Sequence, residues 1–408
     1  MATLSQVHAF LARALARFPW PVVISGPEDR SYTVGGTRAH WCGKPLAIRF
    51  NTVQALNDIL SLNGLGVLEG FVRGDLDMSG NLYALAYLGD YLDLGLPKGR
   101  LLAFLLKHRF SQSLRRAKLN VCSHYDIPQD VLATYLDKKY LSYSCAMFED
   151  PACFRVEDLT TPGQGRHDTF DSLEKAQWRK FRDAVDFIDP RRGETLLDVG
   201  CGYGGQLVVA LELHPFGKVV GCTHSQNQCV FGRQLLAAFD PGLWELRQAD
   251  YREDTRVFDH VTSTGMVSHV GPRGLVPYVR NVRRRIKNGG RYVHHALMAR
   301  PSARPLEASP GIAFNKMYVW PGFHWYTLGE HVRALETNGF HIRRAVDLAP
   351  HYAKTTAAWY ERFIKSKDEI LRLVSGETYR AWQIYLAGNS GSFLTRRSQV
   401  YRLYCEAV

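Results

Sequence analysis

The chain of 408 residues is long enough for two domains, and its 46% hydrophobic and 22% charged residues are typical of a globular protein. Its 51 basic and 39 acidic residues leave a formal net charge of +12, which favours an anionic partner. The chain has no zinc-finger spacing and no RNP-like motif, so we expect this partner to be a phospholipid surface and not a nucleic acid. The eight cysteines have no metal-ligand spacing, so we expect no metal site. No apolar run approaches the roughly 18 residues of a membrane span, so we expect a cytoplasmic protein with only peripheral membrane contact.

Residues 1–115 are predicted to form a smaller N-terminal domain of mixed α and β structure. The first 20 residues have the pattern of an amphipathic helix interrupted by arginines, not of a signal peptide. Residues 96–116 carry an apolar face that runs directly into basic residues, which is typical of a helix at a membrane interface. The same pattern is also typical of a helix packed between two domains, and both interpretations remain open.

Residues 116–408 are predicted to form the second domain, in which strands and helices alternate. A helix is expected over 172–188, and the chain ends with helices followed by a strand over 399–404. The segment 301–321 interrupts the alternation and is predicted to be a lid or a substrate-facing insertion. The alternation predicts an α/β fold with a doubly wound, Rossmann-like parallel sheet.

A glycine loop at residues 196–205 is the most informative motif in the chain. An apolar run carrying Asp198 breaks into Gly200, Cys201 and Gly202, and then continues as an apolar, helix-like segment. This strand–turn–helix pattern lets a ligand touch the backbone and aims a helix N-terminus at it. It predicts a nucleotide-like cofactor.

The strands that follow the loop indicate which cofactor binds. A nicotinamide cofactor would need an acidic residue at the end of the next strand. Residues 218–222 end instead in Thr223, and no Walker pattern follows the glycines. A third strand ends near Ala249 and Tyr251, and a fourth is expected over 259–265. This layout predicts a class I methyltransferase that uses S-adenosylmethionine.

Several further motifs occur in order along the chain. They are His124-Tyr125-Asp126, Tyr143-Ser144-Cys145-Ala146-Met147-Phe148, Ser172-Leu173-Glu174-Lys175-Ala176-Gln177, Thr223-His224-Ser225-Gln226-Asn227-Gln228, Gly265-Met266-Val267-Ser268-His269-Val270-Gly271, Asn315-Lys316, Trp320-Pro321-Gly322 and Ala358-Trp359-Tyr360-Glu361-Arg362-Phe363. With the glycine loop, they resemble the cyclopropane-fatty-acid synthase family of methyltransferases, which includes the mycolic acid modifying enzymes. The resemblance implies methylation of the double bond of unsaturated acyl chains in membrane phospholipids. It also implies a lipid-engaging N-terminal domain and a homodimer.

The resemblance implies which residues bind S-adenosylmethionine. They are Tyr143, Ser144, Asp198, Gly200, Cys201, Gly202, Thr223, Gln228, Ala249 and Tyr251. Within this set, Tyr143 and Ser144 are expected at the methionine end of the cofactor, and the glycines are expected to contact it through their backbone. Thr223 and Gln228 are expected at the ribose, and residues 249–251 at the adenine.

The implied reaction places physical demands on the rest of the site. An isolated alkene is a poor nucleophile, so the sulfonium methyl donor must act in a dry pocket. Methyl transfer leaves a carbocation on the acyl chain, and each desolvated aromatic face can stabilise that cation by about 2 kcal/mol. Aromatic residues in this part of the chain are Tyr143, Phe148, Tyr318, Trp320, Trp325 and Trp359. A base must then remove a proton, and removal from the new methyl group closes a cyclopropane ring.

The family uses a bound bicarbonate as this base, held by a cysteine, a glutamate, a histidine, a tyrosine and a backbone group. The matching positions here are Cys145, His295, Tyr352 and the backbone of Leu297. We choose His295 over its neighbour His294 because adjacent strand residues face opposite sides. The glutamate is replaced by Ser268, which can share a hydrogen bond but brings no charge. Bicarbonate binding is therefore left open, and so is the choice between a cyclopropane and a methyl-branched product.

Two other functions remain open from the sequence. Relatives of this fold that keep the cofactor motifs but lack the bicarbonate site methylate amines or other small molecules, and Ser268 is consistent with such divergence. A lipid-binding protein without activity would not need the intact glycine loop, Thr223 or Cys145. The N-terminal domain and the +12 charge favour the lipid methyltransferase.

Overall fold

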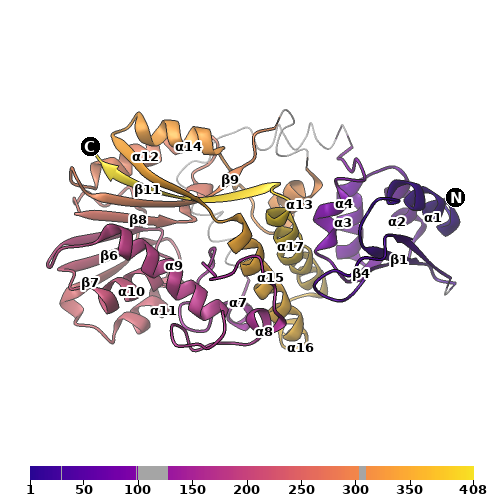
Figure 1. The fold of residues 1–408 in the computed structure, drawn as a ribbon, viewed down its shortest axis with the longest axis horizontal. Helices are drawn as coiled ribbons and strands as arrows, with labels where there is room; N and C mark the ends of the chain where they lie inside the picture. Colours follow the sequence, from indigo (N-terminus) through magenta and orange to yellow (C-terminus); the bar gives the residue numbers. More distant parts are fainter. Residues whose placement is uncertain (29, 98, 100–126, 303–308) are drawn as a thin grey trace. The chain divides into compact units, whose positions relative to one another are not determined.

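The computed structural model describes residues 1–28, 30–97, 99, 127–302 and 309–408 (Figure 1). Most of the helix predicted over 96–116, the motif His124–Asp126 and the domain boundary predicted at 115/116 lie outside these residues. The chain divides into two compact units, each assembled from separate segments. Unit 1 comprises Met1–Phe110, Ser302–Pro321 and Lys367–Thr395, and unit 2 comprises Ser111–Pro301, Gly322–Ser366 and Arg396–Val408.

Unit 1 is built on a four-stranded sheet in the order β2-β1-β3-β4. Its strands are β1 (Pro21–Ser25), β2 (Ser31–Gly35), β3 (Leu46–Phe50) and β4 (Leu76–Gly80). β1 and β3 run parallel, and the other neighbouring pairs run antiparallel. Its helices are α1 (Leu4–Ala14), α2 (Val53–Leu60), α3 (Gly64–Arg73), α4 (Ala84–Leu88), α13 (Pro310–Tyr318), α16 (Lys367–Leu371) and α17 (Gly376–Leu394). The N-terminal part of the chain is thus a mixed α and β unit that later segments complete.

The later segments join unit 1 through close helix packing. α13 packs against α3, and α17 packs against both α3 and α4. At Gly391 on α17, a Cβ atom would lie 2.5 Å from the carbonyl oxygen of Tyr83, so a larger residue would hold α17 away from the N-terminal helices. The described part of the segment predicted as a lid therefore contributes α13 to unit 1. The sequence analysis assigned both helices to the second domain, because contacts across such distances in the chain leave no local pattern.

Unit 2 contains a seven-stranded sheet in the order β10-β11-β9-β8-β5-β6-β7. Its strands are β5 (Thr195–Val199), β6 (Lys218–Thr223), β7 (Trp244–Gln248), β8 (His260–Thr264), β9 (Arg291–Ala299), β10 (Phe340–Asp347) and β11 (Ser398–Ala407). The strands from β5 to β9 run parallel, and β11 runs antiparallel between β9 and β10. β5 lies between β6 and β8, so its carboxyl end is the switch point at which open α/β sheets bind ligands. The predicted α/β fold with a doubly wound, mostly parallel sheet is confirmed.

Helices cover both faces of this sheet (Figure 1). One face carries α9 (Leu173–Ile188), α10 (Gly205–Leu213) and α11 (Gln226–Leu236), and the other carries α12 (Leu275–Arg284) and α14 (Leu328–Glu336). Successive residues of β5 serve the two faces in turn: Leu196 packs in the core under α9, α10 and α11, and Leu197 packs in the core under α12 and α14. This two-sided burial explains why the strand is apolar throughout rather than alternating.

Two elements of unit 2 follow the sequence prediction closely. α9 matches the helix predicted over 172–188, and Ser172 caps it by accepting a hydrogen bond from the backbone N–H of Lys175 at 3.0 Å. β11 contains the strand predicted over 399–404. The remaining helical elements of the unit are α7 (Gln129–Tyr135), α8 (Val156–Thr160), α15 (Ala349–Lys365) and the short 3-10 helices η1 (Pro241–Leu243) and η2 (Met266–His269). α15 packs against both α7 and α8.

Candidate active site

The glycine loop connects β5 to α10 with three glycines in the left-handed region. Gly200, Gly202 and Gly204 have φ angles of 75°, 54° and 83°, which residues other than glycine rarely adopt. A Cβ atom on Gly200 would also lie 2.8 Å from Cγ of Met266. The backbone N–H groups of Gly200 and Cys201 donate to the carbonyl of Cys222 at 3.1 and 3.0 Å, which ties the loop to the end of β6. The loop is thus a fixed backbone surface at the switch point of the sheet.

Asp198 precedes this loop at the end of β5 and is buried. Its Oδ1 accepts a hydrogen bond from Thr262 Oγ1 on the neighbouring strand β8 at 2.8 Å. Burial raises the pKa of Asp198 to about 7. A positively charged ligand group beside this carboxyl group would lower its pKa and favour its charged form.

The end of β6 brings three more predicted cofactor residues together. Thr223 Oγ1 donates to Gln228 Oε1 at 2.5 Å, and the backbone N–H of Ala249 donates to the carbonyl of Thr223 at 3.1 Å. Ser225 caps α11 by accepting from the N–H of Gln228 at 3.3 Å, which fixes the turn between them. Tyr251 packs edge-on against Tyr278, with ring centroids 5.5 Å apart. The ends of β5, β6 and β7 thus place the predicted cofactor residues along one edge of the sheet.

The segment that carries Tyr143, Ser144 and Cys145 is held by one face of α15. Thr355 Oγ1 accepts from the backbone N–H of Ala146 at 3.0 Å, and His351 Nδ1 accepts from that of Phe148 at 3.1 Å. Lys354 Nζ donates to the carbonyl of Asp150 at 3.0 Å. These side chains lie three and four positions apart, so they project from the same face of the helix. Sequence reasoning missed all three.

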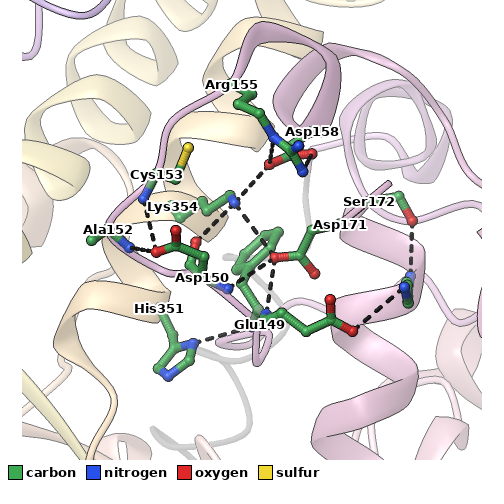
Figure 2. Close-up of polar contacts among 12 residues, drawn as sticks. Glu149, Asp150, Ala152, Cys153, Arg155, Asp158, Asp171, Ser172, His351 and Lys354 are labelled. Atoms are coloured by element: carbon green, nitrogen blue, oxygen red, sulfur yellow. Dashed lines mark hydrogen bonds and ion pairs between the residues drawn. The ribbon is translucent and has the colours of Figure 1, made fainter. Parts of the chain in front are cut away.

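Lys354 anchors this segment at a buried ionic cluster (Figure 2). Its Nζ lies 2.8 Å from Asp158 Oδ2 and 3.5 Å from Asp171 Oδ2. Asp171 in turn accepts from the backbone N–H groups of Glu149 and Asp150 at 2.9 and 3.3 Å. Removing one member of such a cluster leaves an uncompensated buried charge, so the position of the segment depends on all of them.

Cys145 lies against Leu348, the residue that precedes α15, and Tyr352 lies in the first turn of this helix. The carbonyl of Leu348 accepts from the N–H of Tyr352 at 2.9 Å and lies 3.7 Å from Cys145 Sγ. The N–H of Leu348 donates to Val400 on β11, which pairs with Leu297 on β9. Burial raises the pKa of the Cys145 thiol to about 12, so the thiol is neutral and can only donate a weak hydrogen bond.

His295 lies on β9, directly across from Arg402 on β11. Arg402 Nε and Nη2 both lie 3.3 Å from His295 Nδ1, and Arg402 Nη1 pairs with Asp183 Oδ2 at 2.7 Å. A guanidinium group has donors and no acceptor, so Nδ1 must accept and the imidazole proton must sit on Nε2. Burial, followed by the charge of Arg402, holds the pKa of His295 well below its usual range. His295 is thus a neutral ring with an Nε2–H donor, and Arg402 is a site residue that the sequence did not reveal.

His294, the alternative weighed from the sequence, faces the opposite core. Its Nδ1 lies 2.7 Å from Tyr292 Oη and its Nε2 lies 2.9 Å from His331 Nδ1 on α14. Both ring nitrogens are therefore engaged within the packing under α12 and α14. The structure separates the two histidines, as the alternation of a strand requires.

Ser268 lies in η2 and is buried. Its Oγ has no hydrogen-bond partner among the residues that the structure describes. The N–H of Gly265, at the start of this turn, donates to the carbonyl of His295 at 2.9 Å, which holds η2 beside β9. A buried hydroxyl without a partner costs free energy unless a ligand satisfies it.

The aromatic residues predicted to face the reaction are divided between the two units. In unit 2, Tyr143 stacks on Trp359 with ring centroids 4.9 Å apart, and Tyr352 meets the same indole edge-on at 5.9 Å. Tyr318 and Trp320 belong to unit 1. Tyr143, Trp359 and Tyr352 thus form one aromatic cluster in unit 2, and Phe148 of the Cys145 segment lies against Lys354, whose Nζ is 4.7 Å from its ring centroid.

The residues predicted to hold bicarbonate differ in what they offer an anion. His295 has an Nε2–H group, and Ser268 has a hydroxyl that lacks a partner among the described residues. The neutral thiol of Cys145 already points at the carbonyls of Ala146 and Leu348, at 3.2 and 3.7 Å. Arg402 places a buried positive charge behind His295. Donors backed by a positive charge favour an anion, although the carboxylate that the family uses is absent at position 268.

Comparison with known proteins identifies the family of the chain. Residues 112–403 match the family model described as mycolic acid cyclopropane synthetase. The chain is 31% identical over 340 residues to a probable fatty acid methyltransferase of Pseudomonas putida, which covers 82% of this chain and 79% of that protein. It is 27% identical over 404 residues to the cyclopropane-fatty-acyl-phospholipid synthase of Escherichia coli K12, which covers 93% of this chain and 94% of that protein.

A solved structure supports the same relationship and the cofactor. The mycolic acid cyclopropane synthase CmaA1, complexed with SAH and CTAB, matches with a TM-score of 0.63 and 26% identity, covering 71% of this chain and 98% of that one. SAH is the product that S-adenosylmethionine leaves after methyl transfer. The protein is therefore a member of the mycolic acid cyclopropane synthetase family and an S-adenosylmethionine-dependent methyltransferase.

Proposed function

We propose that this methyltransferase acts on the double bond of unsaturated fatty acyl chains in membrane phospholipids. The observation that carries the proposal is the buried and uncharged state of Cys145, His295 and Ser268, together with the stacked Tyr143–Trp359 pair of the same unit. An alkene offers no charge to recognise, and such a site provides aromatic faces and few water-accessible groups. The names of the relatives from Pseudomonas putida and Escherichia coli support an acyl acceptor.

When bound, S-adenosylmethionine supplies an electrophilic methyl group on a sulfonium centre. The residues of the chain then have to hold the acceptor, exclude water and stabilise positive charge. The stacked rings of Tyr143 and Trp359 can stabilise a cation on the acyl chain by about 2 kcal/mol for each desolvated face. The segment bearing Tyr143 is fixed by α15, so its ring is positioned before the acyl chain binds.

Removal of the proton after methyl transfer is not assigned to His295. Its Nε2 already carries a proton, and its Nδ1 accepts from Arg402. His295 therefore donates a hydrogen bond and holds an anion rather than acting as a base. Bicarbonate, when bound, would supply the base, and Cys145, Ser268, His295 and Tyr352 would hold it.

Ser268 determines how much of the product contains a ring in this proposal. A serine offers a hydroxyl but no negative charge to orient a bound anion. A loosely oriented base removes the proton of the new methyl group less selectively. The product is accordingly a cyclopropane, a methyl-branched acyl chain, or both.

Peripheral contact with an anionic membrane is part of the proposal. The net charge of +12 favours anionic head groups. No helix in the described part of the chain is long and apolar enough to cross a bilayer. The acyl chains would then be reached from the membrane surface.

The deciding experiment expresses the chain in bacteria that contain monounsaturated phospholipid and lack a cyclopropane synthase of their own. Fatty acid methyl esters are then analysed by mass spectrometry. A gain of one CH2 unit, with either ring-specific or branch-specific fragments, is expected. Unchanged fatty acids in cells whose purified protein still binds S-adenosylmethionine would overturn the acyl substrate. Transfer of a labelled methyl group from S-adenosylmethionine to an amine, in place of an acyl chain, would establish the alternative acceptor class.

A further inference from the structure

Lys180 is a fully buried lysine for which the methyl-transfer chemistry gives no role. It lies on α9, beneath the segment that carries Ser142 and Ser144, and its side chain is inaccessible to solvent. Within the described residues it forms no ion pair, whereas the equally buried Lys354 pairs with Asp158 at 2.8 Å. A buried charge without an opposite charge beside it is costly. Burial accordingly lowers the pKa of Lys180 to about 7, while the charge of the buried Asp137 acts in the opposite direction. An anion bound nearby would favour the charged form of Lys180 further.

All three protons of this ammonium group are directed by hydrogen bonds. Lys180 Nζ donates to Ser142 Oγ at 2.5 Å, to Ser144 Oγ at 2.8 Å and to Gln177 Oε1 at 2.7 Å. An ammonium group has three donors and no acceptor. In the charged form of Lys180, both serine oxygens therefore accept from Nζ, and each serine keeps its own hydroxyl proton to donate elsewhere.

The two serine hydroxyls form a short chain that ends in a donor. Ser142 Oγ and Ser144 Oγ lie 3.1 Å apart, so one of the two hydroxyl protons can be used between them. The other proton has no acceptor among the described residues. Ser142 is buried and Ser144 is only partly so, which places the free donor on Ser144. A donor polarised by a lysine selects an anionic acceptor.

This donor lies on the side of α9 that meets the glycine loop. A Cβ atom on Gly205, where α10 begins, would lie 2.7 Å from the ring of Phe181, the neighbour of Lys180. Gln206 Nε2 also donates to the carbonyl of Phe181 at 3.2 Å. Lys180 Nζ lies 3.9 Å from the centroid of the same Phe181 ring, which places it beside the start of α10. A cationic group in this position suits the α-carboxylate at the methionine end of S-adenosylmethionine.

We propose that Lys180 is a positioning residue for the cofactor: it orients the Ser144 hydroxyl and supplies the positive charge that the α-carboxylate of S-adenosylmethionine requires. Ser144 makes the contact, and Lys180 acts through it. This role concerns the cofactor alone and is independent of the acyl acceptor, so it is tested without lipid.

The test compares two ligands that differ only in this carboxylate. The affinities of S-adenosylmethionine and of decarboxylated S-adenosylmethionine are measured by isothermal titration calorimetry for the wild type, Lys180→Met and Ser144→Ala. We expect each substitution to lower the affinity for S-adenosylmethionine by about tenfold or more. The affinity for the decarboxylated ligand should fall by less than about twofold. The double variant should lose no more than Lys180→Met alone, because the two residues act as one unit.

Lys316→Met is the matched control, because it removes a buried lysine of unit 1, outside the segments that carry Lys180 and Ser144. It should lower the melting temperature while leaving the ratio of the two affinities unchanged. Equal losses for both ligands in Lys180→Met would overturn the proposal, since that result indicates a structural role. Ser144→Ala is a mild change at a partly exposed position and carries the test even where Lys180→Met does not fold. An unchanged ratio in Ser144→Ala would also overturn the proposal.

Discussion

The two halves of the candidate site in unit 2 differ in whether backbone or side-chain groups form them. The cofactor half consists mainly of backbone at the ends of β5, β6 and β7, with glycines in the left-handed region. The acceptor half consists of side chains from η2, β9, β11 and α15, which are far apart in the chain and are held by buried polar contacts. Backbone geometry leaves little freedom for change, whereas one substitution of a side chain alters the chemistry. This difference explains how Ser268 departs from the family while the glycine loop keeps its pattern.

The largest effect is expected from a change in the backbone half. Gly200→Ala places a side chain at a φ of 75° and 2.8 Å from Met266 Cγ. We expect the affinity for S-adenosylmethionine to fall by more than about tenfold in calorimetric titration. Gly289→Ala is the matched control, because Gly289 has a φ of 76° and no atom within 4 Å of a Cβ. Normal affinity in Gly200→Ala would show that the loop has room to shift, and the contrast between the two halves would disappear.

Arg402→Gln is expected to have the next largest effect, and it acts mainly through His295, although Arg402 also donates to the backbone carbonyl of Lys180 at 2.9 Å. Removing the charge of Arg402 relieves one of the causes that lower the pKa of His295, so this pKa rises towards its usual value of 6.5. A protonated His295 would lower the basicity of any anion that it holds, so the acid limb of the pH profile should lie at a higher pH in Arg402→Gln than in the wild type. Burial still lowers this pKa in the variant, so the shift of the limb is the quantity to measure. We expect kcat to fall by about tenfold.

Arg362→Gln provides the control for this experiment. Arg362 is also buried in unit 2, where it binds both carboxylate oxygens of Glu174 at 2.8 and 3.0 Å. Its loss should reduce stability without shifting the acid limb of the pH profile. Identical pH profiles for wild type and Arg402→Gln would show that Arg402 does not control the protonation of His295.

Ser268→Glu is expected to change the product more than the rate. The new carboxylate would restore the charge that the family places beside the bicarbonate, so the proportion of cyclopropane to methyl-branched product should rise. Gas chromatography with mass spectrometry of the fatty acid methyl esters measures this ratio. Ser268→Ala, which adds no charge, should not raise it. An unchanged ratio in Ser268→Glu would show that another position determines the product.

The smallest effect is expected where the acceptor half is held in place. Thr355→Val removes the acceptor of the backbone N–H of Ala146. A buried donor left without a partner should lower the free energy of unfolding by about 1–3 kcal/mol. Thr356→Val is the neighbouring control, because the hydroxyl of Thr356 bonds within its own helix, to the carbonyls of Tyr352 and Ala353. Equal losses in urea denaturation would show that Thr355 does not hold the segment.

The sequence predicts the backbone half well and the acceptor half only in part. The glycine loop, the strand ending at Thr223 and the helix over 172–188 follow local patterns, and the structure contains all of them. Arg402 could not be recognised, because its place opposite His295 depends on the register between β9 and β11. The sequence also did not predict the roles of Lys180 and of the α15 face, because their partners lie in other segments of the chain. The individual roles of the site residues remain predictions that the experiments above test.

The discontinuous make-up of unit 1 has a consequence for synthesis on the ribosome. The sheet of β1 to β4 and helices α3 and α4 leave the ribosome early, but α17, which packs against both helices, is among the last elements to be made. The nascent N-terminal segment therefore keeps an uncovered apolar surface while the whole parallel part of unit 2 is being translated. Incomplete cores of this kind attract chaperones and promote aggregation. A fragment ending near residue 115 should accordingly be poorly soluble, and supplying α17 as a separate peptide should restore its packing.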